Sequence, residues 1–186
     1  MRKGLYEKMN NDVERIICSE EQIAVAVKQL GARITEDYAG KRPVLLCVLK
    51  GASLFHADLI RAVNLPCEVD FITAKSYGMG AKSSGKLRIL KEPDINICGR
   101  DLIIVEDILD TAVTLSALIH TLLESKPSSI KTAVFLDKNI GREKPVKADY
   151  KCFDAENEFL VGYGLDYAER YRNLPYVGVL KREIYE

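Results

Sequence analysis

The residues of this chain that are best suited to chemistry are three acids behind an apolar run. Glu106 and Asp107 directly follow Ile103–Val105, and Asp110 comes three positions after Asp107. Carboxylates can hold sugar hydroxyls or a divalent metal ion, and they can accept a proton. Adjacent side chains on a strand point to opposite faces, so both acids cannot be buried cheaply. We therefore expect them at the mouth of a sheet, with ordinary solvated charge at a strand end as the alternative.

A short turn with two hydroxyl groups follows the acids and opens a helix. The turn consists of Thr111, Ala112, Val113 and Thr114, and the helix is predicted over Thr114–Glu124. Free backbone amides at a helix start, together with the helix dipole, bind phosphate groups. Asp110 or Thr111 could instead cap the helix, which does not exclude phosphate binding. This order of residue types predicts a site for a phosphorylated sugar.

The elements that must position these residues alternate between strand and helix. Val44–Leu49 and Leu102–Glu106 are almost continuously apolar, which is typical of strands buried on both faces of a parallel sheet. Further strands are predicted at Glu68–Ala74, Leu87–Leu90, Ile130–Leu136, Glu158–Gly162 and Val177–Leu180, and further helices at Glu20–Leu30, with Ser19 as N-cap, and Ala52–Val63. This alternation favours an α/β fold, an open, mainly parallel, twisted sheet with helices on both faces.

Length and composition indicate one ordinary globular domain. The chain has 186 residues, of which 47% are hydrophobic and 29% charged, enough for one core. We expect a single domain over residues 1–186, with residues 1–10 as a flexible tail. Lys+Arg and Asp+Glu are both 27, so no overall charge attracts nucleic acid or an anionic membrane. No apolar run approaches the roughly 20 residues that span a bilayer, and the N-terminus lacks the apolar centre of a signal peptide.

The thiols and imidazoles do not form a recognisable site. The number of cysteines is odd, and their spacing matches neither a zinc nor a redox site: Cys18, Cys47, Cys67, Cys98 and Cys152. We interpret them as free thiols in a reducing, cytoplasmic location. His56 and His120 are isolated from each other and from companions suited to a metal or a triad. In contrast, residues 75–86 are rich in Gly, Ser and Lys and can bury little, so we expect them to be mobile.

The run Val105–Leu115 resembles the phosphoribosyl pyrophosphate signature of type I phosphoribosyltransferases. In detail it is similar to the hypoxanthine (hypoxanthine-guanine) form, Val-Glu-Asp-Ile-x-Asp-Thr/Ser-Gly-x-Thr-Leu. Four other landmarks of that family recur in the same order: Leu49-Lys50-Gly51, Ser76-Tyr77-Gly78, Leu136-Asp137-Lys138 and Val161–Tyr167. The resemblance extends from about Glu14 to Leu180. It implies the type I phosphoribosyltransferase fold, with a small hood formed by the N- and C-terminal segments and a mobile lid loop.

This resemblance also implies a reaction of purine salvage. N9 of hypoxanthine, and of guanine, would attack the anomeric carbon of phosphoribosyl pyrophosphate, releasing pyrophosphate and forming IMP or GMP. The transition state would resemble an oxocarbenium ion. The implied partners are phosphoribosyl pyrophosphate and a purine base, with Mg²⁺ as cofactor and no nucleic acid. Because the family forms dimers and tetramers, we expect a homo-oligomer.

The resemblance further assigns roles to the residues that match the family's motifs. Asp110 would be the catalytic base at purine N7, since an ordinary aspartate is ionised at neutral pH. The ribose and 5′-phosphate would be held by Glu106, Asp107, Asp110, Thr111, Ala112, Val113 and Thr114. Pyrophosphate would be held by Lys50, Gly51 and Arg172, with a cis peptide near Lys50, and the metal ion would be held by Glu106, Asp107 and Asp166. The purine would be held by Lys138, Phe159, Leu160 and Asp166. The lid would begin at Ser76 and Tyr77 and close over the reacting centre.

One departure from the family's pattern lies in the phosphate turn. Ala112 stands where the family usually has glycine, and a positive φ there would cost alanine about 1 kcal/mol. Val113 is also unusual, because a β-branched residue is poorly suited to a tight turn. We expect retained activity, with weaker binding of phosphoribosyl pyrophosphate.

Three alternatives remain beside this interpretation. The enzyme could prefer another purine such as xanthine, or the chain could be an RNA-binding regulator on the same fold, like the pyrimidine operon attenuators. The zero net charge and the lack of a dense Lys/Arg stripe with aromatics count against the regulator. The third alternative is a catalytically dead homologue, which the presence of Asp110 argues against.

Overall fold

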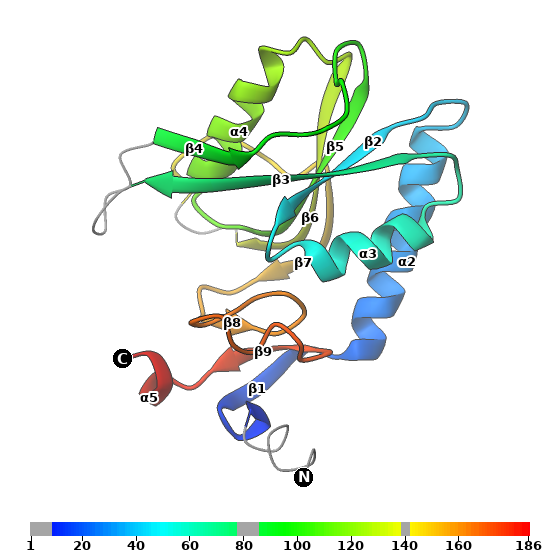
Figure 1. Ribbon diagram of the computed structural model, residues 1–186. Helices are drawn as coiled ribbons and strands as arrows, with labels where there is room; N and C mark the ends of the chain where they lie inside the picture. Colours follow the sequence, from blue (N-terminus) through cyan, green and yellow to red (C-terminus); the bar gives the residue numbers. More distant parts are fainter. Residues whose placement is uncertain (1–8, 78–85, 139–141) are drawn as a thin grey trace.

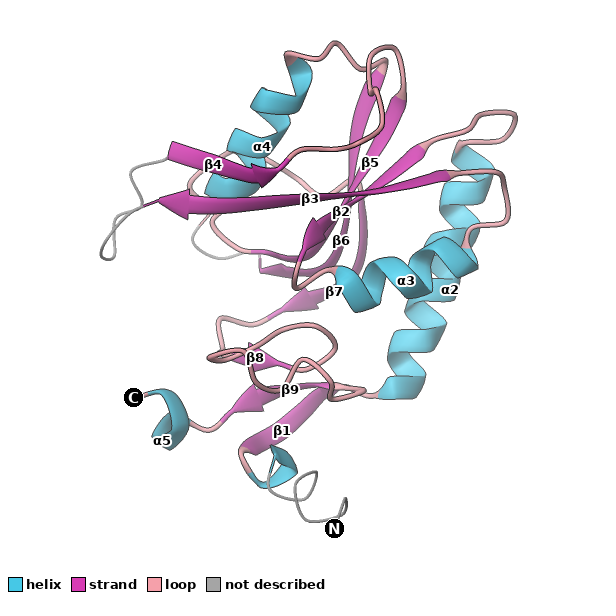
Figure 2. Cartoon of the chain, viewed as in Figure 1, coloured by secondary structure: helices cyan, strands magenta, loops and turns pink. Residues whose placement is uncertain are grey.

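The computed structural model describes residues 9–77, 86–138 and 142–186. These residues form a six-stranded sheet with the strand order β4-β3-β2-β5-β6-β7 (Figures 1 and 2). Its strands are β2 Val44–Leu49, β3 Glu68–Tyr77, β4 Lys86–Lys91, β5 Asp101–Leu109, β6 Ser129–Lys138 and β7 Tyr150–Ala155. Neighbouring strands pair in parallel, except that β4 lies antiparallel to β3 at the edge. The predicted open, mainly parallel sheet is confirmed.

Helices cover both faces of this sheet, which explains its continuously apolar strands. Helices α2 (Glu20–Asp37) and α3 (Ser53–Ala62) lie on one face, and α4 (Val113–Leu123) lies on the other (Figure 1). Within β2, Leu45 belongs to the core shared with α2 and α3, whereas Leu46 belongs to the core beneath α4. Alternate residues of one strand therefore enter different cores, and neither face needs polar residues.

A second, smaller sheet joins the two ends of the chain. It consists of β1 (Val13–Cys18), β9 (Val177–Leu180) and β8 (Leu160–Val161), which pair antiparallel, and α5 (Arg182–Tyr185) follows. The sequence predicts a flexible tail over residues 1–10, but its last two residues are held in place. Met9 packs against the apolar cluster of this sheet, and Asn10 Oδ1 accepts a hydrogen bond from Tyr176 at 2.6 Å.

The element boundaries follow local physical signals. Ser19 and Gln22 form a capping box at the start of α2, as the N-cap prediction requires. The helix runs past the predicted Leu30 because Ile34 continues its buried face. Strand β5 also runs further than predicted, to Leu109. Strands β1 and β7 were not predicted, because several of their residues are exposed and polar.

Two further sequence expectations concern segments near the sheet. The backbone of Ser76 and Tyr77 forms the end of β3, and the rest of the expected lid, residues 78–85, lies outside the described residues. No helix in the described ranges is both long and apolar enough to cross a membrane.

Candidate active site

Two adjacent acids, Glu106 and Asp107, lie within β5 rather than beyond its end. Both carboxylates bend back to the strand: Glu106 Oε1 accepts from the amide of Asp107 at 3.2 Å, and Asp107 Oδ1 accepts from the amide of Ile108 at 2.9 Å. Burial, followed by the negative charge of Asp107, raises the pKa of Glu106 well above its ordinary value of 4.5. A hydroxyl donor or a cation at this pair would relieve that repulsion.

Two glycines let the segments after β2 and after β8 stack in turn on Asp107 of β5. A Cβ built on Gly51 would lie 1.6 Å from Asp107 Oδ2, so only a glycine lets the loop after β2 approach this carboxylate. A Cβ on Gly164, whose φ is +100°, would lie 2.0 Å from the carbonyl oxygen of Gly51. The segments after β2 and after β8 are thus stacked on β5. The peptide bond between Leu49 and Lys50, next to this contact, is cis.

Asp110 and Lys138 face each other at the carboxyl ends of neighbouring strands. Strands β5 and β6 pair Leu109 with Asp137, so the residues that follow are also neighbours. Lys138 Nζ lies 3.8 Å from Asp110 Oδ2, and the exposed fractions of the two side chains are 11% and 49%. The lysine is therefore a buried residue at the end of β6, whereas its sequence context alone resembled that of a surface lysine. The pair presents a hydrogen-bond donor and an acceptor side by side.

The turn after Asp110 contains the left-handed backbone conformation that glycine adopts easily, although this chain has alanine at position 112. Ala112 is the N-cap of α4 and adopts the left-handed conformation, with φ 64° and ψ 6°. The Ala112 side chain provides no capping hydrogen bond, and the amide of Val113 makes only a long contact of 3.5 Å with Thr111 Oγ1. The amides of such a helix start can bind an anion. Val113 was expected in the tight turn, but the structure places it outside that turn. It is the first residue of α4, where its buried side chain is compatible with helical geometry.

An ion-pair network joins the loop at Lys50 to the segment after β8. Lys50 Nζ lies 3.2 Å from both carboxylate oxygens of Glu169, which lowers the pKa of that carboxyl. Arg172 lies 2.7 Å from Asp166 and 3.4 Å from Glu169, and it also donates to the carbonyl of Gly164 at 2.7 Å. Lys50 and Arg172 are thus brought together by an anionic side chain.

Sequence reasoning missed Glu169, because a single glutamate in a polar loop has no distinguishing pattern. Its position depends on a loop in which Ala168, Glu169 and Tyr171 all have positive φ, at 51°, 62° and 74°. Only the acid spacing Asp166-x-x-Glu169 could have indicated a second carboxylate near the cations.

Phe159, expected to stack on a purine, already has aromatic neighbours. Its ring stacks on Tyr185 at a centroid distance of 4.7 Å and meets Tyr167 edge-on at 5.5 Å. It remains 36% exposed, and the adjacent Leu160 is buried in β8. The C-terminal helix α5 therefore supports the ring.

The three acids expected to bind metal are not gathered into one cluster. Within residues 9–77, 86–138 and 142–186, no three acidic, histidine or cysteine side chains could hold a metal ion by themselves. Asp166 instead pairs with Arg172. Glu106 and Asp107 do stay together, and their oxygen atoms are the hard ligands that Mg²⁺ prefers. Mg²⁺ usually binds one or two carboxylates together with phosphate oxygens and water, so the pair fits such an ion.

A cavity of about 850 Å³ lies elsewhere, between α2, α3 and residues 173–175. None of the residues expected to carry chemistry lines it. The site is therefore defined by the convergence of β5, β6 and the loops at Lys50 and Gly164, rather than by this cavity.

Comparison with known proteins agrees with this arrangement. Residues 16–168 match the phosphoribosyl transferase domain family. The hypoxanthine-guanine phosphoribosyltransferase of Streptococcus thermophilus (strain CNRZ 1066) is 52% identical over 177 residues, covering 95% of this chain and 98% of that protein. The enzyme of the same name from Bacillus subtilis (strain 168) is 48% identical over 178 residues, covering 96% and 99%. A crystal structure of a hypoxanthine phosphoribosyltransferase from Staphylococcus aureus superposes with a TM-score of 0.94 at 40% identity, covering 96% of this chain and 97% of that chain. The chain therefore belongs to the phosphoribosyltransferase family, in its hypoxanthine-guanine phosphoribosyltransferase group.

Proposed function

We propose that this protein transfers the 5-phosphoribosyl group from phosphoribosyl pyrophosphate to N9 of hypoxanthine, and of guanine, in purine salvage. The observation that carries the proposal is the pairing of Lys138 and Asp110 at 3.8 Å. A 6-oxopurine presents a carbonyl oxygen, O6, and the N7 position on one edge. Lys138 would donate to O6, and Asp110 would accept the proton at N7. Adenine has an amino group in place of O6. This amino group would face the Lys138 ammonium, so two hydrogen-bond donors would meet and adenine is disfavoured.

The remaining residues match the charge changes of the reaction. Glu106 and Asp107 would face the ribose, where negative groups stabilise the positive charge that develops as pyrophosphate leaves. The start of α4, at Ala112, would hold the 5′-phosphate. Lys50 and Arg172 would receive the leaving pyrophosphate after exchanging their contacts with Glu169. Phe159 would stack on the purine through a face that Tyr185 leaves open.

We further propose that Mg²⁺ is the cofactor, held by Glu106 and Asp107 together with oxygen atoms of the substrate. Bound Mg²⁺ would neutralise charge on the departing pyrophosphate. Asp166 would reach the ion only after a rearrangement of its pair with Arg172 or through water. We also expect a homo-oligomer that acts in the cytoplasm, where the five cysteines, all free in the structure, stay reduced.

The test is incubation with Mg²⁺, phosphoribosyl pyrophosphate and one purine at a time, with nucleoside monophosphate as the readout. Hypoxanthine and guanine should react, and adenine should not. Exclusive reaction with xanthine would reject the substrate assignment. RNA binding without nucleotide formation would instead support a regulator on the same fold.

The role of Asp110 is tested separately. Replacing Asp110 with asparagine should reduce kcat by about 10²–10⁴-fold, the usual contribution of a general base, because the amide cannot accept the N7 proton. The matched control is Asp94→Asn, at an exposed aspartate paired with Lys91. Full activity of Asp110→Asn would refute the assignment.

A further inference from the structure

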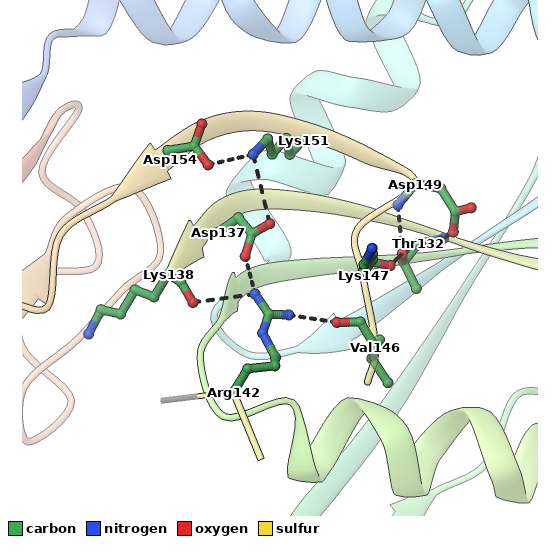
Figure 3. A network of polar contacts seen from close by, with 9 residues as sticks. All are labelled: Thr132, Asp137, Lys138, Arg142, Val146, Lys147, Asp149, Lys151 and Asp154. Carbon is green, nitrogen blue, oxygen red and sulfur yellow. Dashed lines mark hydrogen bonds and ion pairs between the residues drawn. The ribbon is translucent and has the colours of Figure 1, made fainter. Parts of the chain in front are cut away.

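Arg142 connects the end of β6 to the loop that begins at residue 142, where the described part of the chain resumes after Lys138 (Figure 3). Its guanidinium forms an ion pair with Asp137 and donates to the carbonyl oxygens of Lys138, at 3.3 Å, and Val146, at 2.8 Å. Asp137 is only 6% exposed and therefore needs a cationic partner. In Figure 3 the carbonyl of Lys138 points toward Arg142, while the side chain of Lys138 extends away from this network.

The same loop also holds the turn proposed to bind the 5′-phosphate. The backbone amides of Glu143 and Lys144 donate to the carbonyl oxygen of Thr111, at 2.9 and 3.3 Å. Thr111 directly follows Asp110 and precedes the left-handed Ala112. One loop thus contacts both halves of the site: the strand end that carries Lys138 and the turn that opens α4.

Such a connection is needed because the strand pairing stops short of the site. The register between β5 and β6 ends at Leu109 and Asp137, so no further pairing between the strands fixes the distance from Lys138 to the turn. Arg142 lies where its side chain can help to fix this distance. Its planar fork contacts one carboxylate and two carbonyl oxygens at once, which a lysine ammonium cannot reproduce in the same geometry.

We propose that Arg142 is a positioning residue that sets the spacing between the purine-binding lysine and the phosphate-binding turn. The proposal rests on the function proposed above. It makes purine binding and phosphoribosyl pyrophosphate binding depend on a residue that touches neither substrate. Loss of the fork would let the end of β6 and the turn move independently, so the affinity for both substrates would fall together.

The test compares Arg142→Ala and Arg142→Lys with the wild type in steady-state kinetics. Arg142→Ala should raise KM for hypoxanthine and for phosphoribosyl pyrophosphate, each by about tenfold or more. Arg142→Lys should give an intermediate rise, because it keeps the charge opposite Asp137 but loses the fork. Lys147→Ala is the control: it removes an exposed charge from the same loop and should leave both KM values unchanged.

The kinetic constants separate positioning from a merely structural role. If Arg142 only stabilised the fold, the variants would contain less active enzyme, which lowers kcat but leaves KM intact. Should Arg142→Ala fail to fold, Arg142→Lys and Asp137→Asn decide the question, because both retain the size of the side chain. Unchanged KM values for both substrates in the folded variants would overturn the proposal. A wild-type protein that forms no nucleotide would instead reject the proposed function.

Discussion

The contact between Gly51 and Asp107 makes a sharp prediction for the substitution Gly51→Ala. The new Cβ would lie 1.6 Å from Oδ2 and 2.5 Å from Cγ of Asp107, so the carboxylate must turn away. Gly51 has no left-handed backbone angle, and alanine would otherwise be tolerated there. The substitution therefore isolates the steric effect on a side chain that we place at the ribose.

The cost can be worked out from the contacts of Asp107. Turning the carboxylate breaks its hydrogen bond from the amide of Ile108, which involves a charged acceptor and is worth about 1.5–3 kcal/mol. A distorted rotamer adds about 0.5–1.5 kcal/mol, and the reduced entropy of the unfolded chain returns about 0.4–1 kcal/mol. The net loss is about 1–4 kcal/mol, which lowers the melting temperature of a chain of this size by roughly 3–12 °C. We expect kcat/KM to fall at least tenfold as well.

Thermal melts and steady-state kinetics of two related variants complete the experiment. Asp107→Ala removes the atoms that clash, so adding Gly51→Ala in that background should cost little further stability. Gly40→Ala is the control: Gly40 has φ +75° and open space around its Cβ, so that variant should lose some stability without losing activity. Normal kinetics and an unchanged melting temperature for Gly51→Ala would refute the reasoning.

Three other predictions follow from the site and the core. Ala112→Gly should change the free energy of unfolding by less than about 1 kcal/mol. The substitution relieves about 1–2 kcal/mol of left-handed strain, but the greater entropy of the unfolded chain and the loss of one buried methyl group offset this gain. A melting temperature shifted by more than about 4 °C would contradict this balance. Glu169→Gln should lower KM for phosphoribosyl pyrophosphate by no more than about fivefold, because it frees Lys50 from an exposed and therefore weak ion pair; a raised KM would show that Glu169 helps rather than competes. Burial lowers the pKa of His56 below its ordinary 6.5, so on acidification the unfolded chain binds the proton before the folded protein does. Stability should therefore fall as the pH drops through about 6.5. His56→Gln should flatten that part of the plot of melting temperature against pH, and an identical plot would exclude His56 as the cause.

Local patterns were sufficient for the main elements of the fold. The apolar runs of β2 and β5 predicted a parallel sheet covered on both faces, because a strand that enters two cores has no polar side. Ser19 marked the start of α2 as its N-cap, which the structure confirms. The order of acids, hydroxyls and helix start between Glu106 and Thr114 predicted where a phosphorylated sugar would be expected. These signals depend only on near neighbours in the chain.

The tertiary structure alone decided how distant residues meet in the site. Glu169 reaches Lys50 across more than a hundred positions through a loop with three positive φ angles, and no residue pattern specifies such a loop. Gly51 and Gly164 are two of twelve glycines in the sequence, and only the structure shows that Gly51 packs on Asp107 and Gly164 on the carbonyl of Gly51. Arg142 stood in an unremarkable polar segment, and its contacts with Asp137 and Lys138 depend on where that loop folds back. Patterns along the chain describe which face of an element is buried, whereas these contacts depend on where the loops return, and that is determined by the packing of the whole domain.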